Sequence, residues 1–161
     1  MTAAPEKPIA VPDGNGWGTH LPAVVHYVLR TAGPILELGA GLWSTPVLHA
    51  ISARQGRPLV TAEADPAWLG RFADLRSDRH AFLTGYDAEA IDACDWSVVL
   101  IDHAMDRRQR DLLRLRRRAR FLVCHDTNCV KYGWDFGPFR FRREWALLSP
   151  TVTVVSDVEQ P

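Results

Sequence analysis

Acidic residues, histidines and glycines recur in this sequence at the ends of short apolar runs. In an open α/β sheet, ligands bind outside the carboxyl ends of the strands. If the apolar runs are parallel strands, the polar and small residues that follow them should meet in one pocket. In chain order they are Glu37, Gly39, Gly41, Glu63, Tyr86, Asp87, Asp102, His103, His125, Asp126 and Thr127.

Several of these residues have a chemistry that suits a nucleoside-like cofactor. Gly39 and Gly41 lack side chains, so a ligand could approach the backbone closely. The amides at the start of the next helix could bond a polar group. Glu63 could accept both hydroxyls of a ribose, and Asp87 could accept from an adenine amino group. The candidate cofactor-binding residues are Glu37, Gly39, Ala40, Gly41, Ser44, Thr45, Glu63, Asp87 and Asp102.

Plainer interpretations of the same residues remain open. A Gly-x-Gly pair after a strand can be just a tight turn, and Glu63 can be a solvated strand end. Asp87 lies in a Gly-Tyr-Asp-Ala turn, where aspartate is common for purely local reasons.

Strands and helices alternate along the chain, which favours parallel βαβ units. We expect helices at 19–30, with Thr19 as its cap, at 46–54, after Asp65-Pro66, and at 107–118, a strongly basic segment. We expect strands at 35–38, 58–63, 80–84, 96–101, 121–124 and 151–156. The predicted fold is an α/β doubly wound, mostly parallel sheet with helices on both faces, shortened at the C-terminal strands. Residues 1–18 form an irregular lead-in, and 19–161 form one domain.

Composition sets limits on partners and compartment. The chain has 161 residues, with 19 basic and 19 acidic side chains, so net charge gives no reason to expect a nucleic-acid partner. No apolar run approaches the roughly 20 residues of a membrane span. Three cysteines without a CxxC spacing indicate free thiols and a cytoplasmic location. An exposed last strand would allow a homodimer that covers this edge.

Two arginine-rich stretches have two interpretations each. The segment 107–118 is either a solvated helix face or a surface for an anionic substrate or RNA. In 136–141, aromatic residues alternate with an arginine, as in single-stranded nucleic-acid binders. The same segment could instead cover an acceptor site.

A dinucleotide-binding fold is the main alternative for the glycine turn. Its G-x-G-x-x-G fingerprint fails at the third glycine, where this chain has Ser44. Glu37, two residues before the first glycine, would repel a pyrophosphate. A carboxylate suits S-adenosylmethionine, which carries a sulfonium and an ammonium group.

The segment Ile35-Leu36-Glu37-Leu38-Gly39-Ala40-Gly41 resembles the first motif, E/D-x-G-x-G, of the class I S-adenosylmethionine-dependent methyltransferases. Glu63 falls at that family's ribose-binding acid. The segment 99–107 is similar to the D-H-x-x-D-R segment of catechol-type O-methyltransferases, and 125–127 falls at their Asp-Asn pair. The resemblance implies the cofactor S-adenosylmethionine and a magnesium ion at Asp102 and Asp126. That family's catalytic lysine would fall at Met105, which cannot ionise.

These residues lead to a functional hypothesis with alternatives. We expect methyl transfer to an oxygen or nitrogen of a small-molecule acceptor, with His103, His125 and Asp102 as catalytic candidates. Asp102 and Asp126 would position either a divalent cation or the two histidines, one of which deprotonates the acceptor. The histidines could instead be structural. The alternatives are a non-catalytic S-adenosylmethionine-binding module and an enzyme of different chemistry on the same fold.

Overall fold

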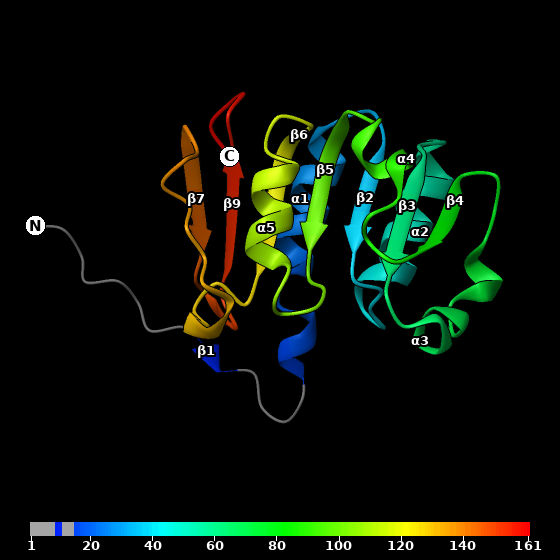
Figure 1. Cartoon of the computed structure of the whole chain (residues 1–161), viewed down its shortest axis with the longest axis horizontal. Helices are drawn as coiled ribbons and strands as arrows, with labels where there is room; N and C mark the ends of the chain where they lie inside the picture. Colours follow the sequence, from blue (N-terminus) through cyan, green and yellow to red (C-terminus); the bar gives the residue numbers. More distant parts are fainter. Residues whose placement is uncertain (1–8, 11–14) are drawn as a thin grey trace, which may run out of the picture.

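A seven-stranded sheet organises the chain in a computed structural model that describes residues 9–10 and 15–161 (Figure 1). The strand order is β4-β3-β2-β5-β6-β9-β7. All neighbours are parallel except β9, which runs antiparallel to both β6 and β7. The strands are β2 (Ile35–Leu38), β3 (Leu59–Glu63), β4 (His80–Thr84), β5 (Trp96–Ile101), β6 (Ala119–His125), β7 (Phe141–Trp145) and β9 (Val152–Ser156). The doubly wound sheet expected from the sequence is confirmed.

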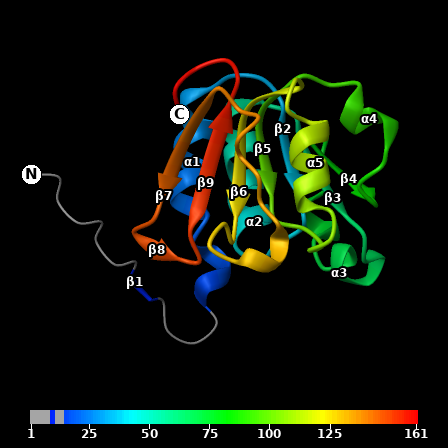
Figure 2. The same cartoon turned by 60° about the vertical axis from the view of Figure 1, so that its left-hand side comes forward.

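Helices cover both faces of this sheet (Figures 1 and 2). On one face, α1 (Leu21–Arg30) contacts β5 and β6, and α2 (Ser44–Gln55) contacts β3 and β4. On the other face, α5 (Arg108–Arg114) packs on β5. The strands β2 and β5 are buried along their whole length. Their alternating side chains therefore join two separate apolar cores, as expected for parallel strands covered on both sides.

Short elements complete the described part of the chain. They are β1 (Ile9–Ala10), which pairs with β8 (Leu148–Ser149), α3 (Pro66–Gly70), α4 (Glu89–Asp92), and the 3₁₀ turns 15–18, 73–75 and 130–132. In Figure 1 the 3₁₀ turn at 15–18 and α3 lie at the end of the sheet to which the arrowheads of β2 and β5 point. Of the irregular lead-in expected at 1–18, residues 1–8 and 11–14 lie outside the described residues.

Two helix starts show where local sequence rules succeed and fail. Asp65 caps α3 as predicted, because its side chain accepts from the amides of Ala67 and Trp68. The predicted cap of α1 is wrong. His20 holds the cap position, and the Thr19 hydroxyl donates instead to the carbonyl of Pro150 at 2.8 Å.

The shortening predicted at the C-terminal strands is not found in the strands themselves, since β7 and β9 are both present with five residues each. What is short is the connection between β6 and β7, which contains only the 3₁₀ turn 130–132. Phe136 and Phe139 are buried against the core on the α5 side. Their rings pack against the sheet, so they are not available to stack on the bases of a single-stranded nucleic acid. That interpretation is wrong for these two residues.

One further expectation about the surface is corrected. The last strand, β9, is buried between β6 and β7, so the edge strands are β4 and β7 and the reason given for a homodimer no longer holds.

The arginines of 107–118 are largely paired with acids, among them Asp87, Asp95 and Asp157. Within the described ranges, no helix has both the length and the apolar character that a membrane crossing requires.

Candidate functional site

A cavity of about 440 Å³ opens at the carboxyl ends of β2 and β5. Such a volume lies within the range of small-ligand sites. The loop from β2 to α2 forms one wall, and the residues before α1, α3 and the loop after β5 form the others. The lining residues are Trp17, His20, Gly39, Ala40, Gly41, Leu42, Trp43, Ser44, Trp68, Asp102 and Arg108. The predicted pocket at the strand ends is therefore present, and it contains five of the nine predicted cofactor-binding residues.

The first glycine of the loop is needed for a reason other than the one expected. Gly39 has a φ of 98°, a conformation that other residues rarely adopt. A Cβ there would lie 2.3 Å from the carbonyl oxygen of Asp102. Gly39 thus lets the loops after β2 and β5 pack against each other. At Gly41 a Cβ would lie 2.8 Å from Ser44 Oγ, so this glycine also makes room for protein.

Glu37 lies beneath the loop and is fully buried. Its Oε2 accepts hydrogen bonds from the hydroxyls of Thr45 (2.9 Å) and Thr61 (2.7 Å). Burial raises the pKa of Glu37 to about 7, although hydrogen bonds from neighbouring hydroxyls oppose the shift. Glu37 and Thr45 are both fully buried, and their hydrogen bonds support the loop from beneath, so their direct contact with a cofactor stays a prediction.

Glu63 ends β3 beside the same loop. Its carboxylate accepts from the amide of Ala40 (3.1 Å), the amide of Asp65 (3.0 Å) and the hydroxyl of Tyr86 (3.1 Å). The Trp68 indole donates to the carbonyl of Ala40 at 2.7 Å, which brings α3 to the cavity wall. Glu63 is not itself among the lining residues, but its carboxylate bonds the amide of Ala40, which is, so its contact with a ribose stays a prediction.

Asp87 has partners that do not favour the predicted contact with adenine. Its oxygens accept from Arg107, Arg110 and Arg114, and the guanidinium of Arg107 holds the pKa of Asp87 down to about 2. Asp87 is absent from the cavity lining. The arrangement identifies it as an anchor for arginines of α5.

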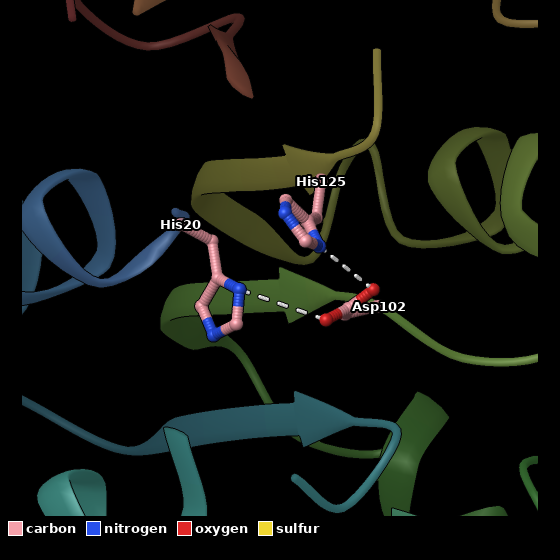
Figure 3. Close-up of side chains that lie close together, drawn as sticks. All are labelled: His20, Asp102 and His125. Carbon is pink, nitrogen blue, oxygen red and sulfur yellow. Dashed lines mark ion pairs between the residues drawn. The ribbon is translucent and has the colours of Figure 1, made fainter. Parts of the chain in front are cut away.

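Asp102, directly after β5, is the centre of a polar cluster at the cavity (Figure 3). Its Oδ1 lies 3.1 Å from His125 Nδ1, and its Oδ2 lies 3.6 Å from His20 Nδ1. Burial raises the pKa of Asp102, but His125 and the guanidinium of Arg108 outweigh this effect and hold it below its usual value. The carboxylate is thus charged at neutral pH.

His20 is the member of this cluster that sequence reasoning missed. It is 2% exposed and lines the cavity. Burial lowers the pKa of His20 to about 4, against the opposing charge of Asp102, so the ring is neutral at pH 7. No motif surrounds His20, so no pattern in the sequence marks it as a site residue. The helix start alone, placed against β5 and β6, brings it to the site.

Of the two predicted catalytic histidines, the structure brings only His125 to Asp102. His103 Nε2 lies 2.7 Å from Asp111 Oδ2, with both side chains fully buried. Its ring also meets the ring of Tyr86 edge-on, with centroids 4.5 Å apart. His103 does not line the cavity. The expectation that it acts as a catalytic base is therefore corrected to a structural role under α5.

The magnesium site expected from Asp102 and Asp126 is also corrected. The guanidinium of Arg108 lies between the two carboxylates, 2.9 Å from Asp102 Oδ1 and 2.9 Å from Asp126 Oδ2. It also donates to the carbonyl of His103 (2.7 Å) and stacks on Tyr132 at 4.1 Å. A fixed cation therefore occupies the place between these acids where a magnesium ion would bind.

Comparison with known proteins places the fold. No protein-family model matches the chain, and no curated protein matches its sequence. Solved structures do match. The human methyltransferase 10 domain containing protein has a TM-score of 0.61 at 13% identity, over 92% of this chain and 84% of that one. A methyltransferase from Geobacter sulfurreducens has a TM-score of 0.58 at 14% identity, over 93% and 81%. The chain has the class I methyltransferase fold.

A third match carries a bound molecule. The N-terminal domain of human METTL16, solved in complex with SAH, matches with a TM-score of 0.55 at 14% identity, over 92% of this chain and 73% of that one. At these identities the likeness is one of fold. The arrangement of strands, with β9 antiparallel between β6 and β7, agrees with the expectation drawn from the Glu37–Gly41 motif.

Proposed function

We propose that this chain is an S-adenosylmethionine-dependent methyltransferase that modifies an oxygen or nitrogen of a small-molecule acceptor. The observation that carries the proposal is the cavity on the Gly39–Gly41 loop, whose wall also contains the carboxylate of Asp102. The solved structures of this fold include a domain in complex with SAH, the demethylated form of the cofactor.

The residues around the cavity fit S-adenosylmethionine. The cofactor has a cationic methionine end, a ribose and an adenine. Asp102, held charged by its neighbours, would favour the positive charges. Glu63, beside Ala40, would take the ribose hydroxyls by exchanging its present amide partners. Trp43 and Trp68 line the cavity, and their rings could contact the adenine or the sulfonium.

When bound, the cofactor supplies an electrophilic methyl group, and the protein must position the acceptor and remove its proton. Asp102 Oδ2 faces His20 at the cavity wall and would accept the hydrogen bond of an acceptor O–H or N–H. Arg108 donates to the other oxygen, Oδ1, at 2.9 Å, so the carboxylate is fixed in place. Asp102 is therefore the proposed proton acceptor, and Arg108 its positioning residue.

The apolar rim supports a small, partly aromatic acceptor. Trp17 is 72% exposed, Leu42 54% and Trp43 47%, and all three line the cavity. Large apolar side chains left this open around a cavity are typical of ligand sites. A flat acceptor could lie between these side chains with its hydroxyl or amine toward Asp102.

Cofactor binding is the first test. Calorimetry or tryptophan fluorescence should detect S-adenosylmethionine and its demethylated product binding to the full chain. Glu63→Gln should weaken the binding of both by about 10- to 150-fold, since charge-assisted hydrogen bonds to the ribose contribute about 1.5–3 kcal/mol. Glu89→Gln, an exposed substitution on α4, is the matched control.

Turnover is the second test. Release of S-adenosylhomocysteine with a panel of phenols, carboxylic acids and amines would support the enzyme. Binding without release for any acceptor would favour the non-catalytic module instead. Absence of binding at millimolar cofactor would contradict both.

A further inference from the structure

The cluster of His20, Asp102 and His125 contains more free ligand atoms than methyl transfer needs. One ligand atom from each residue lies within 4.8 Å of the other two. Within the described residues, both ring nitrogens of His20 and Nδ1 of His125 are buried without a hydrogen-bond partner. Both side chains are 2% exposed. Buried polar atoms of this kind cost free energy unless something binds them.

The hydrogen bonds of Thr19 indicate which ring nitrogen of His125 carries the hydrogen atom and which one has the lone pair. The hydroxyl of Thr19 has one proton, and it lies 2.8 Å from the carbonyl oxygen of Pro150, which can only accept. Thr19 Oγ1 is also 2.8 Å from His125 Nε2, so Nε2 donates to it. In the neutral ring, Nδ1 then presents a lone pair to Asp102 Oδ1 at 3.1 Å. At that distance a lone pair and a carboxylate oxygen repel each other, and a cation beside them would remove the repulsion.

A single proton on His125 would meet this need but leave His20 unexplained. His20 Nδ1 points at the other oxygen of the same carboxylate, 3.6 Å away, and the two rings meet edge-on with centroids 4.7 Å apart (Figure 3). We propose that His20, Asp102 and His125 together bind one divalent transition-metal ion, through Nδ1 of each histidine and the Asp102 carboxylate.

The spacing and the donor types fit such an ion. Metal–ligand bonds of about 2.0–2.1 Å place neighbouring ligands about 3.0 Å apart in an octahedral site and about 3.4 Å apart in a tetrahedral one. The two observed N···O distances, 3.1 and 3.6 Å, lie close to that range. Two imidazoles and one carboxylate suit zinc, cobalt or iron rather than magnesium, which prefers oxygen.

The surroundings leave the site both charged and open. Arg108 bonds Asp102 Oδ1 but is itself balanced by Asp126, so the group of three charges keeps a net negative charge for a metal ion. The hydrogen bond from His125 Nε2 to Thr19 is the outer contact that orients a metal-binding imidazole. Because His20 and Asp102 line the cavity, a vacant coordination position would face it.

Metal binding can be measured without methyl transfer, so this proposal does not depend on the function proposed above. The full chain without a histidine tag, freed of metal by a chelator, is titrated with Co²⁺ by absorption and with Zn²⁺ by calorimetry. One ion per chain should bind, with visible cobalt bands and without the near-ultraviolet charge-transfer band of thiolate ligands. The melting temperature should rise when Zn²⁺ is added.

Variants decide where the ion binds. His20→Ala and His125→Ala should each weaken Zn²⁺ binding on the order of 100-fold or more, since even outer contacts are worth 10- to 100-fold. His26→Gln, on the helix whose cap position His20 holds, should bind the ion as the unaltered chain does. Circular dichroism checks that each variant is folded. If an alanine variant does not fold, His20→Gln is measured in its place. Absence of saturable binding below millimolar Zn²⁺, unchanged affinity in both alanine variants, or equally tight Mg²⁺ binding would each overturn the proposal.

Discussion

Two aspartate–histidine pairs lie near the carboxyl ends of β5 and β6, and they differ in what surrounds them. Asp102 and His125 adjoin a cavity, and the Asp102 side chain is 18% exposed. Asp111 and His103 are 2.7 Å apart, closed under α5 and fully buried. Asp102 and His103 are neighbours in sequence, yet they belong to different pairs. The residue types are therefore enough to suggest a catalytic pair. Whether the pair can act on a ligand depends on its access to a cavity.

Asp102→Asn tests the open pair and has the largest expected effect. The amide keeps the shape but cannot take a proton, so methyl transfer should fall about 100- to 10,000-fold. Binding of S-adenosylhomocysteine should change far less. The measurement is product release per folded molecule, with Asp95→Asn on the surface as the control. Full activity in Asp102→Asn would remove the distinction between the two pairs.

Asp111→Ala tests the closed pair. It removes the buried partner of His103, Arg107 and Arg114, so the free energy of unfolding should fall by about 3–5 kcal/mol. Urea denaturation measures the change. Asp92→Ala, whose 50% exposed side chain also meets Arg114, should change the free energy of unfolding by less than about 0.5 kcal/mol. A negligible effect at Asp111 would mean that the closed pair does not stabilise α5.

The buried carboxyl group of Glu37 should make the stability of the chain depend on pH. Its pKa is 4.5 in the ordinary state and about 7 in the fold. Between these values the folded chain holds a proton that the unfolded chain has lost. Its contribution to stability therefore falls as pH rises through this window, by about 3 kcal/mol in all, and levels off above pH 7. The difference between the unaltered chain and Glu37→Gln isolates this group. A flat difference from pH 4.5 to 7 would contradict the raised pKa.

Asp87→Asn should have the smallest effect. Asp87 anchors arginines of α5 at an exposed position, away from the cavity, so S-adenosylmethionine should bind within about twofold of its usual affinity. Fluorescence titration measures this directly. A tenfold loss would instead restore the adenine contact expected from the sequence.

The sequence predicted the sheet well because its central strands are apolar runs buried on both faces. The run 96–101 coincides with β5, the glycine turn follows β2, and Glu63 ends β3, as expected. The strand β7 was missed because it lies at the edge and carries exposed charges at Arg142, Arg143 and Glu144. Backbone pairing with β9 forms it, and no side-chain pattern signals that pairing.

The site was predicted less completely, for a related reason. His20 reaches Asp102 only because α1 packs across β5 and β6, a contact between distant parts of the chain. Arg108 looked like one arginine among many in a basic segment. Its role between Asp102 and Asp126 depends on being buried, whereas its neighbours Arg107 and Arg110 turn toward Asp87.

We propose that the cavity on the Gly39–Gly41 loop holds S-adenosylmethionine. The direct test is a crystal structure with S-adenosylhomocysteine. We expect the nucleoside in this cavity, with the ribose hydroxyls on Glu63 and the sulfur on the side of Asp102. A ligand bound elsewhere, or an empty cavity at saturating ligand, would contradict it.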